Sequence, residues 1–156
     1  SVFPDDVLAA RLSAGKPSTV YTCCVEAYPN GFTFSPPAEN AWLSWYAASK
    51  GFTGYLRWAY NSWPKSPLTD SRFTAFPAGD TFQVYPNAET SIRFEKLIEG
   101  IQDFEKIRIL KAQWQKEGNE AKLKALQTLL SRFDIEALKT TPAADMMVEG
   151  KAFLNL

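Results

Sequence analysis

The sequence contains no histidine, and its only two cysteines are adjacent, Cys23 and Cys24. Without histidine the chain can form neither a Ser-His-Asp triad nor a histidine-ligated zinc site, and we expect no metal and no cofactor. Net charge is also lacking, because 17 basic residues balance 17 acidic ones. This balance indicates neither nucleic acid nor an anionic membrane surface as a partner. No apolar run approaches the roughly 20 residues that span a bilayer.

The cysteine pair follows an apolar, β-branched run, so we interpret both residues as part of a strand over 19–25. Alternation along a strand then predicts two buried thiols on opposite faces. A disulfide between these neighbours is the alternative, and it would require a distorted peptide that breaks the strand. Two cysteines leave the redox compartment undecided.

The stretch 51–70, GFTGYLRWAYNSWPKSPLTD, begins with strand-forming residues and ends in a proline-broken loop. We predict a strand over 53–60. Its C-terminal end gathers rings and an amide in Trp58, Tyr60, Asn61 and Trp63. Flat rings beside hydrogen-bonding groups suit a sugar, whose C–H faces stack on aromatics. The alternative is that Trp58 and Tyr60 are ordinary core residues.

The remaining pattern predicts an α/β fold with a helical tail. Helices and apolar strands alternate with short connections, which is typical of right-handed βα units on a parallel sheet. Glu26, at the end of the first strand, is a candidate site residue, although a solvated strand end is the more common explanation for such a carboxylate. The predicted helices cover 4–14, 37–50, 92–115 and 121–133, with a last one from Thr141, and the strands cover 19–25, 53–60 and 81–85.

Two helices carry further signals. Trp42, Trp45 and Tyr46 recur at three- and four-residue spacing, which predicts an apolar stripe that packs in the core. Gly100 lies inside a long amphipathic pattern, which indicates close approach of another element.

Four ordered blocks carry a family resemblance: YTCCVEAYPNGFTF, GFTGYLRWAYNSWPKSPLTD, AGDTFQVYPN and SIRFEKLIEGIQDFEKIRIL. Over 20–110 the chain resembles the C-terminal part of the domain of unknown function numbered 4091, which is related to glycoside hydrolase family 123. The resemblance implies part of a (β/α)₈ TIM barrel and action on N-acetylgalactosaminides. Segments 19–25 and 53–60 would be the last two barrel strands, and 92–115 the closing helix.

On this resemblance we divide the chain into a barrel segment, 1–115, and a helical extension, 116–156. Active sites of such barrels lie at the C-terminal ends of the strands. The residues that we expect to line the sugar pocket are Glu26, Trp58, Tyr60, Asn61, Trp63, Arg72 and Asp80.

One departure from the family affects catalysis. The substrate-assisted reaction of family 123 depends on an adjacent Asp-Glu pair, and this sequence contains none. Two strands also cannot close a barrel. We therefore expect a C-terminal fragment of a larger, extracytoplasmic glycosidase-like protein, with no catalytic residue of its own and no turnover alone.

Two other function classes remain open. The aromatic stretch could serve a non-enzymatic carbohydrate-binding module, and the helical tail could bind a protein partner. Besides carbohydrate, the expected partner is a second copy of the chain or the missing N-terminal part of the barrel, because unpaired apolar strands recruit neighbours.

Overall fold

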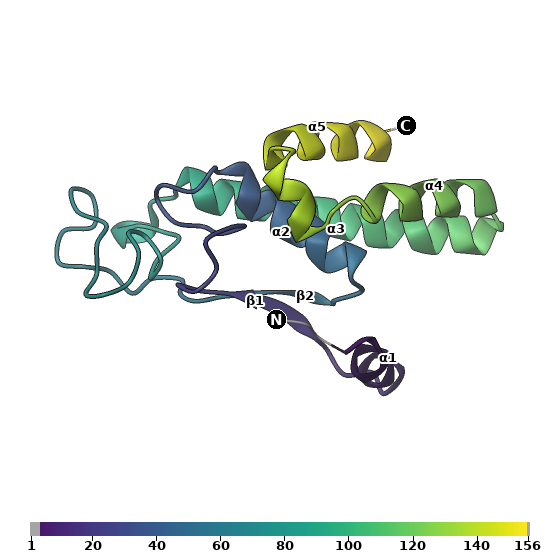
Figure 1. Cartoon of the computed structure of the whole chain (residues 1–156), viewed down its shortest axis with the longest axis horizontal. Coiled ribbons are helices and arrows are strands. Elements are labelled where there is room, and N and C mark those ends of the chain that lie inside the picture. The colour runs from purple at the N-terminus through teal and green to yellow at the C-terminus, as the bar shows by residue number, and fades with distance from the viewer. Residues whose placement is uncertain (1–3, 156) are drawn as a thin grey trace.

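The computed structural model describes residues 4–155. In chain order the elements are α1 (Asp5–Ser13), β1 (Thr19–Thr22), α2 (Ala38–Ser49), β2 (Gly54–Arg57), the 3₁₀ helix η1 (Pro86–Ala88), α3 (Ile92–Glu117), α4 (Glu120–Leu130), the 3₁₀ helix η2 (Ile135–Lys139) and α5 (Ala143–Leu154). The helices α2 to α5 form a layer on one side of the small sheet, and α1 lies beyond the N-terminal end of β1 (Figure 1). No helix among residues 4–155 is long and apolar enough to cross a membrane.

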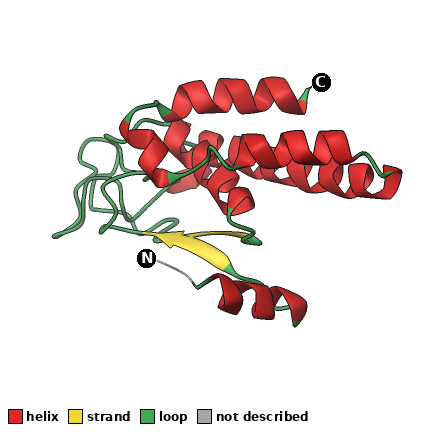
Figure 2. Ribbon diagram, turned by 45° about the vertical axis from the view of Figure 1, so that its right-hand side comes forward, coloured by secondary structure: helices red, strands yellow, loops and turns green. Residues whose placement is uncertain are grey.

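The sheet is a parallel pair, as the order of elements predicts. β1 and β2 run side by side with Thr19 opposite Gly54 and Thr22 opposite Arg57, and α2 connects them. Long loops leave the carboxyl ends of both strands and gather at one end of the molecule (Figure 2). This end of the sheet is where side chains from both strand-end loops meet.

The strands are shorter and less buried than predicted. β1 ends at Thr22 and β2 at Arg57, and the predicted strand over 81–85 is absent, with only an isolated bridge joining Phe82 to Asn61. Tyr21 and Leu56, opposite each other in register, are 45% and 56% exposed. The apolar run of β1 therefore does not reflect burial on both faces, because no described element covers the face that carries these two residues.

The prediction of two buried thiols is wrong. β1 stops before the cysteines, so both residues lie in the following loop, where Cys23 is half-buried and Cys24 is exposed. Both are free thiols, so the disulfide alternative is not formed.

The core lies between α2 and the C-terminal helices. Trp42 and Trp45 have no exposed surface, and Tyr46 packs beside them, so the predicted apolar stripe is confirmed. α3 crosses α2 closely at Gly100, where an added Cβ would lie 2.7 Å from the carbonyl oxygen of Ala41, as the glycine in the helical pattern indicates. The segment after α3 completes this core with Leu126, Phe133, Met146, Met147 and Leu154.

Candidate functional site

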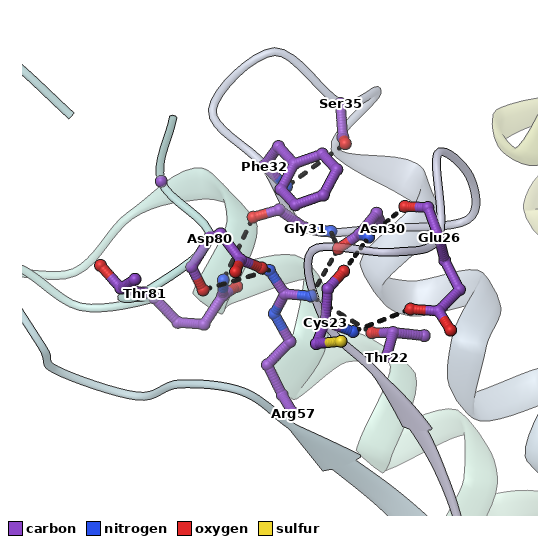
Figure 3. Close-up of polar contacts among 12 residues, drawn as sticks. Thr22, Cys23, Glu26, Asn30, Gly31, Phe32, Ser35, Arg57, Asp80 and Thr81 are labelled. Carbon is purple, nitrogen blue, oxygen red and sulfur yellow. Dashed lines mark hydrogen bonds and ion pairs between the residues drawn. The ribbon is translucent and has the colours of Figure 1, made fainter. Parts of the chain in front are cut away.

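A buried ion pair lies at the carboxyl end of β2 (Figure 3). Arg57 is the last residue of β2, and its Nη2 lies 2.8 Å from Oδ1 of Asp80. The two side chains are only 6% and 0% exposed. A charge that is buried this deeply requires a partner, so the pair fixes the loop that carries Asp80 against the end of β2.

The same guanidinium also holds the loop that follows β1. Its Nη1 donates to Oδ1 of Asn30 and, at 3.3 Å, to the hydroxyl of Thr22. The side-chain amide nitrogen of Asn30, Nδ2, in turn donates to the backbone carbonyls of Cys23 at 2.7 Å and Glu26 at 2.5 Å. Arg57 therefore links both strand-end loops.

Two acidic side chains near this cluster are strongly desolvated. Burial raises the pKa of Asp80 above its ordinary value, and the guanidinium of Arg57 opposes that rise. Burial also raises the pKa of Glu39, whose carboxylate accepts a hydrogen bond of 2.8 Å from the backbone nitrogen of Asn30. Asp80 has no exposed surface, so its carboxylate orders the loops and presents nothing to solvent.

The predicted aromatic residues lie on the loop that follows β2 and keep exposed surface. Trp58 is 42% exposed, and its ring lies beside that of Phe76, with the centroids 6.1 Å apart and the planes tilted by 35°. Trp63 is 38% exposed, and its indole N–H donates to the carbonyl of Val84 at 2.7 Å. Neither indole is sealed in the core, and a sugar cavity shared by the two stays a prediction.

Tyr60 and Asn61 follow Trp58 directly but have different surroundings. Tyr60 meets the ring of Phe94 edge to face at 5.7 Å and lines a cavity of about 430 Å³ between β2 and α3. Asn61 is exposed and forms the bridge with Phe82. Tyr60 therefore points toward α3 and does not share the exposed sheet face on which Leu56 lies.

The other predicted site residues divide into two groups. Glu26 belongs to the polar cluster, because its carboxylate accepts a hydrogen bond of 3.0 Å from the backbone nitrogen of Cys23. Arg72 forms an exposed ion pair of 2.7 Å with Asp70. This pairing lowers the pKa of Asp70 to about 2.

Sequence reasoning did not assign a role to Arg57 or Asn30, which connect the cluster. A signal for Arg57 was present, because a single cation at the end of an otherwise uncharged strand needs a carboxylate if it is buried. The identity of its partner was not readable, since Asp80 lies 23 residues further along the chain.

Two parallel strands joined by a helix, with a polar cluster at their carboxyl ends, are typical of the class of α/β domains. Within that class, the sequence profile of the glycoside hydrolase 123 catalytic domain matches residues 1–110. The chain therefore belongs to that family.

Comparison with solved structures also shows this fold. A family 123 glycoside hydrolase from Clostridium perfringens, described in connection with glycolipid glycan hydrolysis, is similar with a TM-score of 0.75 and 24% sequence identity. The similarity covers 97% of this chain and 28% of that chain, so this chain spans about a quarter of the length of the similar protein. Among curated proteins, no match was found.

Proposed function

We propose that this chain supplies one wall of the sugar pocket of a family 123-type glycoside hydrolase that acts on N-acetylhexosamine glycans of the N-acetylgalactosaminide type. In this proposal the two strands are the last two of a (β/α)₈ barrel, and residues beyond this chain supply the catalytic carboxylates. Terminal amino sugars of glycolipid glycans are a suitable natural substrate, given the subject of the Clostridium perfringens structure.

The observation that carries the proposal is the position of Trp58. Its indole keeps 42% of its surface exposed directly after β2, at the carboxyl end of the strands, while the neighbouring Arg57 is locked to Asp80. A large apolar ring that stays exposed beside a rigid polar cluster is suited to stack on the C–H face of a sugar ring. Asn61, exposed three residues later, would provide hydrogen bonds to hydroxyl or acetamido groups.

Catalysis requires chemical groups that this wall of the pocket does not supply. Glycoside hydrolysis needs a general acid and a second group that stabilises the oxocarbenium-like transition state. The sequence contains no adjacent Asp-Glu pair, and Asp80 is paired with Arg57. We therefore expect the chain alone to bind sugar weakly and not to cleave it.

The test measures binding and cleavage on the chain itself. Titration with N-acetylgalactosamine, followed by tryptophan fluorescence, is expected to show saturable weak binding. The substitution Trp58→Ala should weaken this binding about tenfold, which corresponds to about 1.4 kcal/mol. A chromogenic N-acetylgalactosaminide should release no chromophore.

The matched control is Phe34→Ala, because Phe34 is a 67% exposed ring on the loop after β1, beside Leu138 of the helical segment. It should leave the titration unchanged. Equal affinity of the Trp58→Ala protein and the unmodified chain would refute the sugar-stacking role, and chromophore release would refute the need for outside carboxylates.

A further inference from the structure

A second cavity lies between the loop after β1 and the helical extension. Its volume is about 570 Å³, within the range of about 300–1,000 Å³ that small-molecule sites occupy. None of the residues that we predict for the sugar pocket is among the described residues that line it. The cavity is therefore distinct from the wall that carries Trp58.

Two aromatic rings line the cavity and keep exposed surface. Phe34 is 67% exposed, and its ring lies beside that of the buried Phe32, with the centroids 5.0 Å apart. Tyr28 is 40% exposed. Rings that remain accessible in a cavity can pack against the apolar part of a ligand.

Glu39 brings a buried negative charge to the same cavity. It belongs to the first turn of α2 and is only 8% exposed. Its Oε2 accepts the hydrogen bond from the backbone nitrogen of Asn30, whereas its Oε1 has no partner among residues 4–155. Lys139 also lines the cavity, but its ammonium is paired with Glu136 at 2.6 Å. A buried carboxylate without a cation is unfavourable, and a ligand ammonium group would oppose the rise in the pKa of Glu39 that burial causes.

The N-terminus of α5 brings unpaired hydrogen-bond donors to the cavity. Pro142, at the N-cap, provides no side-chain cap, and no described residue accepts a hydrogen bond from the backbone nitrogen of Ala143 or Ala144. The first N–H groups of a helix have no acceptor within it and form the positive end of its dipole. Ala143 is only 5% exposed, so little water reaches its backbone. The cavity thus contains unpaired groups of both signs.

We propose that this cavity binds a free α-amino acid with an apolar side chain. The ammonium group donates to Oε1 of Glu39, and the carboxylate accepts from the backbone nitrogens of Ala143 and Ala144. The apolar side chain packs on Tyr28 and Phe34. A ligand with one charge alone would leave the other buried group unpaired, so the cavity favours a zwitterion. This binding goes beyond the proposed function and does not depend on it.

Calorimetric titration of this chain with three probes tests the proposal. The probes are L-phenylalanine, 2-phenylethylamine, which lacks the carboxylate, and 3-phenylpropanoate, which lacks the ammonium group. L-phenylalanine should bind at least about tenfold more tightly than either analogue, because each analogue loses charge-assisted hydrogen bonds. In amide NMR spectra, L-phenylalanine and 3-phenylpropanoate should shift the signals of Ala143 and Ala144, and 2-phenylethylamine should not.

The substitution Glu39→Gln separates the charge from the shape of the cavity. Glutamine keeps an oxygen that can accept the hydrogen bond from Asn30. The variant should bind L-phenylalanine and 2-phenylethylamine about tenfold more weakly and 3-phenylpropanoate with unchanged affinity. The matched control is Glu120→Gln, an exposed glutamate in the first turn of α4, which should change none of the three affinities.

A second variant tests the aromatic side of the cavity without touching a buried group. Phe34→Ala should weaken the binding of all three probes and leave the titration with N-acetylgalactosamine unchanged. Trp58→Ala should have the opposite effect, with sugar binding weakened and L-phenylalanine binding unchanged. These two variants distinguish failure of this inference from failure of the proposed function.

Absence of L-phenylalanine binding, or equal affinities for the three probes, would overturn the proposal. Equal weakening of L-phenylalanine and 3-phenylpropanoate by Glu39→Gln would also overturn it, because the carboxylate would then act on the shape of the cavity and not on the ammonium group. Amino-acid binding in a chain that binds no sugar would support this inference and count against the proposed function alone.

Discussion

Arg57 shows how one buried charge can order two loops that are distant in sequence. Its guanidinium contacts Asp80 on one side and Asn30 on the other, and Phe32 lies 5.6 Å from it, ring centroid to guanidinium carbon. None of these contacts is near in sequence, so Arg57 is one of the residues that hold the loop after β1 to the loop after β2. The exposed indole of Trp58 depends on this arrangement because it follows Arg57 directly.

Replacement of Arg57 by alanine should destabilise the protein strongly. The substitution leaves the carboxylate of Asp80 buried without its cation, a change that typically costs about 3–5 kcal/mol of unfolding free energy. Urea denaturation measures the loss. The control is Arg72→Ala, which breaks the exposed pair with Asp70 and should leave the midpoint unchanged. A similar midpoint for both variants would show that the Arg57–Asp80 pair adds nothing to stability.

At the scale of elements, the close crossing of α2 and α3 determines how the helical layer sits on the sheet. At Gly100 an added Cβ would meet the carbonyl oxygen and Cα of Ala41 at 2.7 and 2.8 Å and the hydroxyl of Ser44 at 2.8 Å. Two of these atoms belong to the backbone of α2, so the helices would have to move apart. The distance between α2 and α3 is thus set by the absence of a side chain at Gly100.

The substitution Gly100→Ala should therefore lower stability, although alanine is the better helix former. Overpacking of a tight contact costs about 1–3 kcal/mol, which exceeds the gain of up to ~1 kcal/mol in helix propensity. Gln102→Ala, at an exposed position of the same helix, should be neutral or slightly stabilising. Thermal melting by circular dichroism compares the two, and a stabilised Gly100→Ala protein would show that α2 can move away at no cost.

Helices were predictable because their signals are local. Ser91 caps α3 by accepting a hydrogen bond from the backbone nitrogen of Phe94, and Gly118 ends the helix in a left-handed conformation. The helical spacing of Trp42 and Trp45 in the sequence is enough to predict that both are buried. These signals lie within a few residues of one another, so the sequence is sufficient to read them.

Strand lengths and the polar cluster were not predictable to the same degree, since both depend on distant neighbours. The apolar run of β1 predicts burial on two faces, but Tyr21 is exposed because nothing described covers that face. Asp80 is a carboxylate on a loop, as a site residue could be, and only the fold reveals that it forms an ion pair with Arg57. The aromatic residues Trp58, Tyr60 and Trp63 lie in the loop beyond the end of β2 at Arg57, and their role in sugar binding stays a prediction.

At the scale of the whole molecule, the helical extension, residues 116–156, and the βα units share one core. Trp42 donates its indole N–H to the sulfur of Met146 at 3.2 Å, and the indole N–H of Trp45 donates to Asp103 at 3.0 Å. Gly150 of α5 packs against the ring of Trp45, where an added Cβ would lie 2.6 Å from the nearest ring carbon. The proposed division after residue 115 therefore does not separate two independent cores, and a truncation can test it.

A chain ending at residue 115 should fail to fold. Besides Ala143, it lacks five large buried apolar side chains of the shared core, Leu126, Phe133, Met146, Met147 and Leu154. At about 1.5–3 kcal/mol each, their loss is on the order of 10 kcal/mol, comparable to the ~5–15 kcal/mol stability of a typical domain. The control is a truncation from the other end, residues 16–156, which removes α1 and, of the core residues among 4–15, only Leu8. Near-ultraviolet circular dichroism of the tryptophans and a thermal melt should show a cooperative transition for 16–156 and none for 1–115. A cooperative melt of 1–115 would mean that residues 116–156 are a separable extension, and that Trp42 and Trp45 find enough contacts within the first 115 residues.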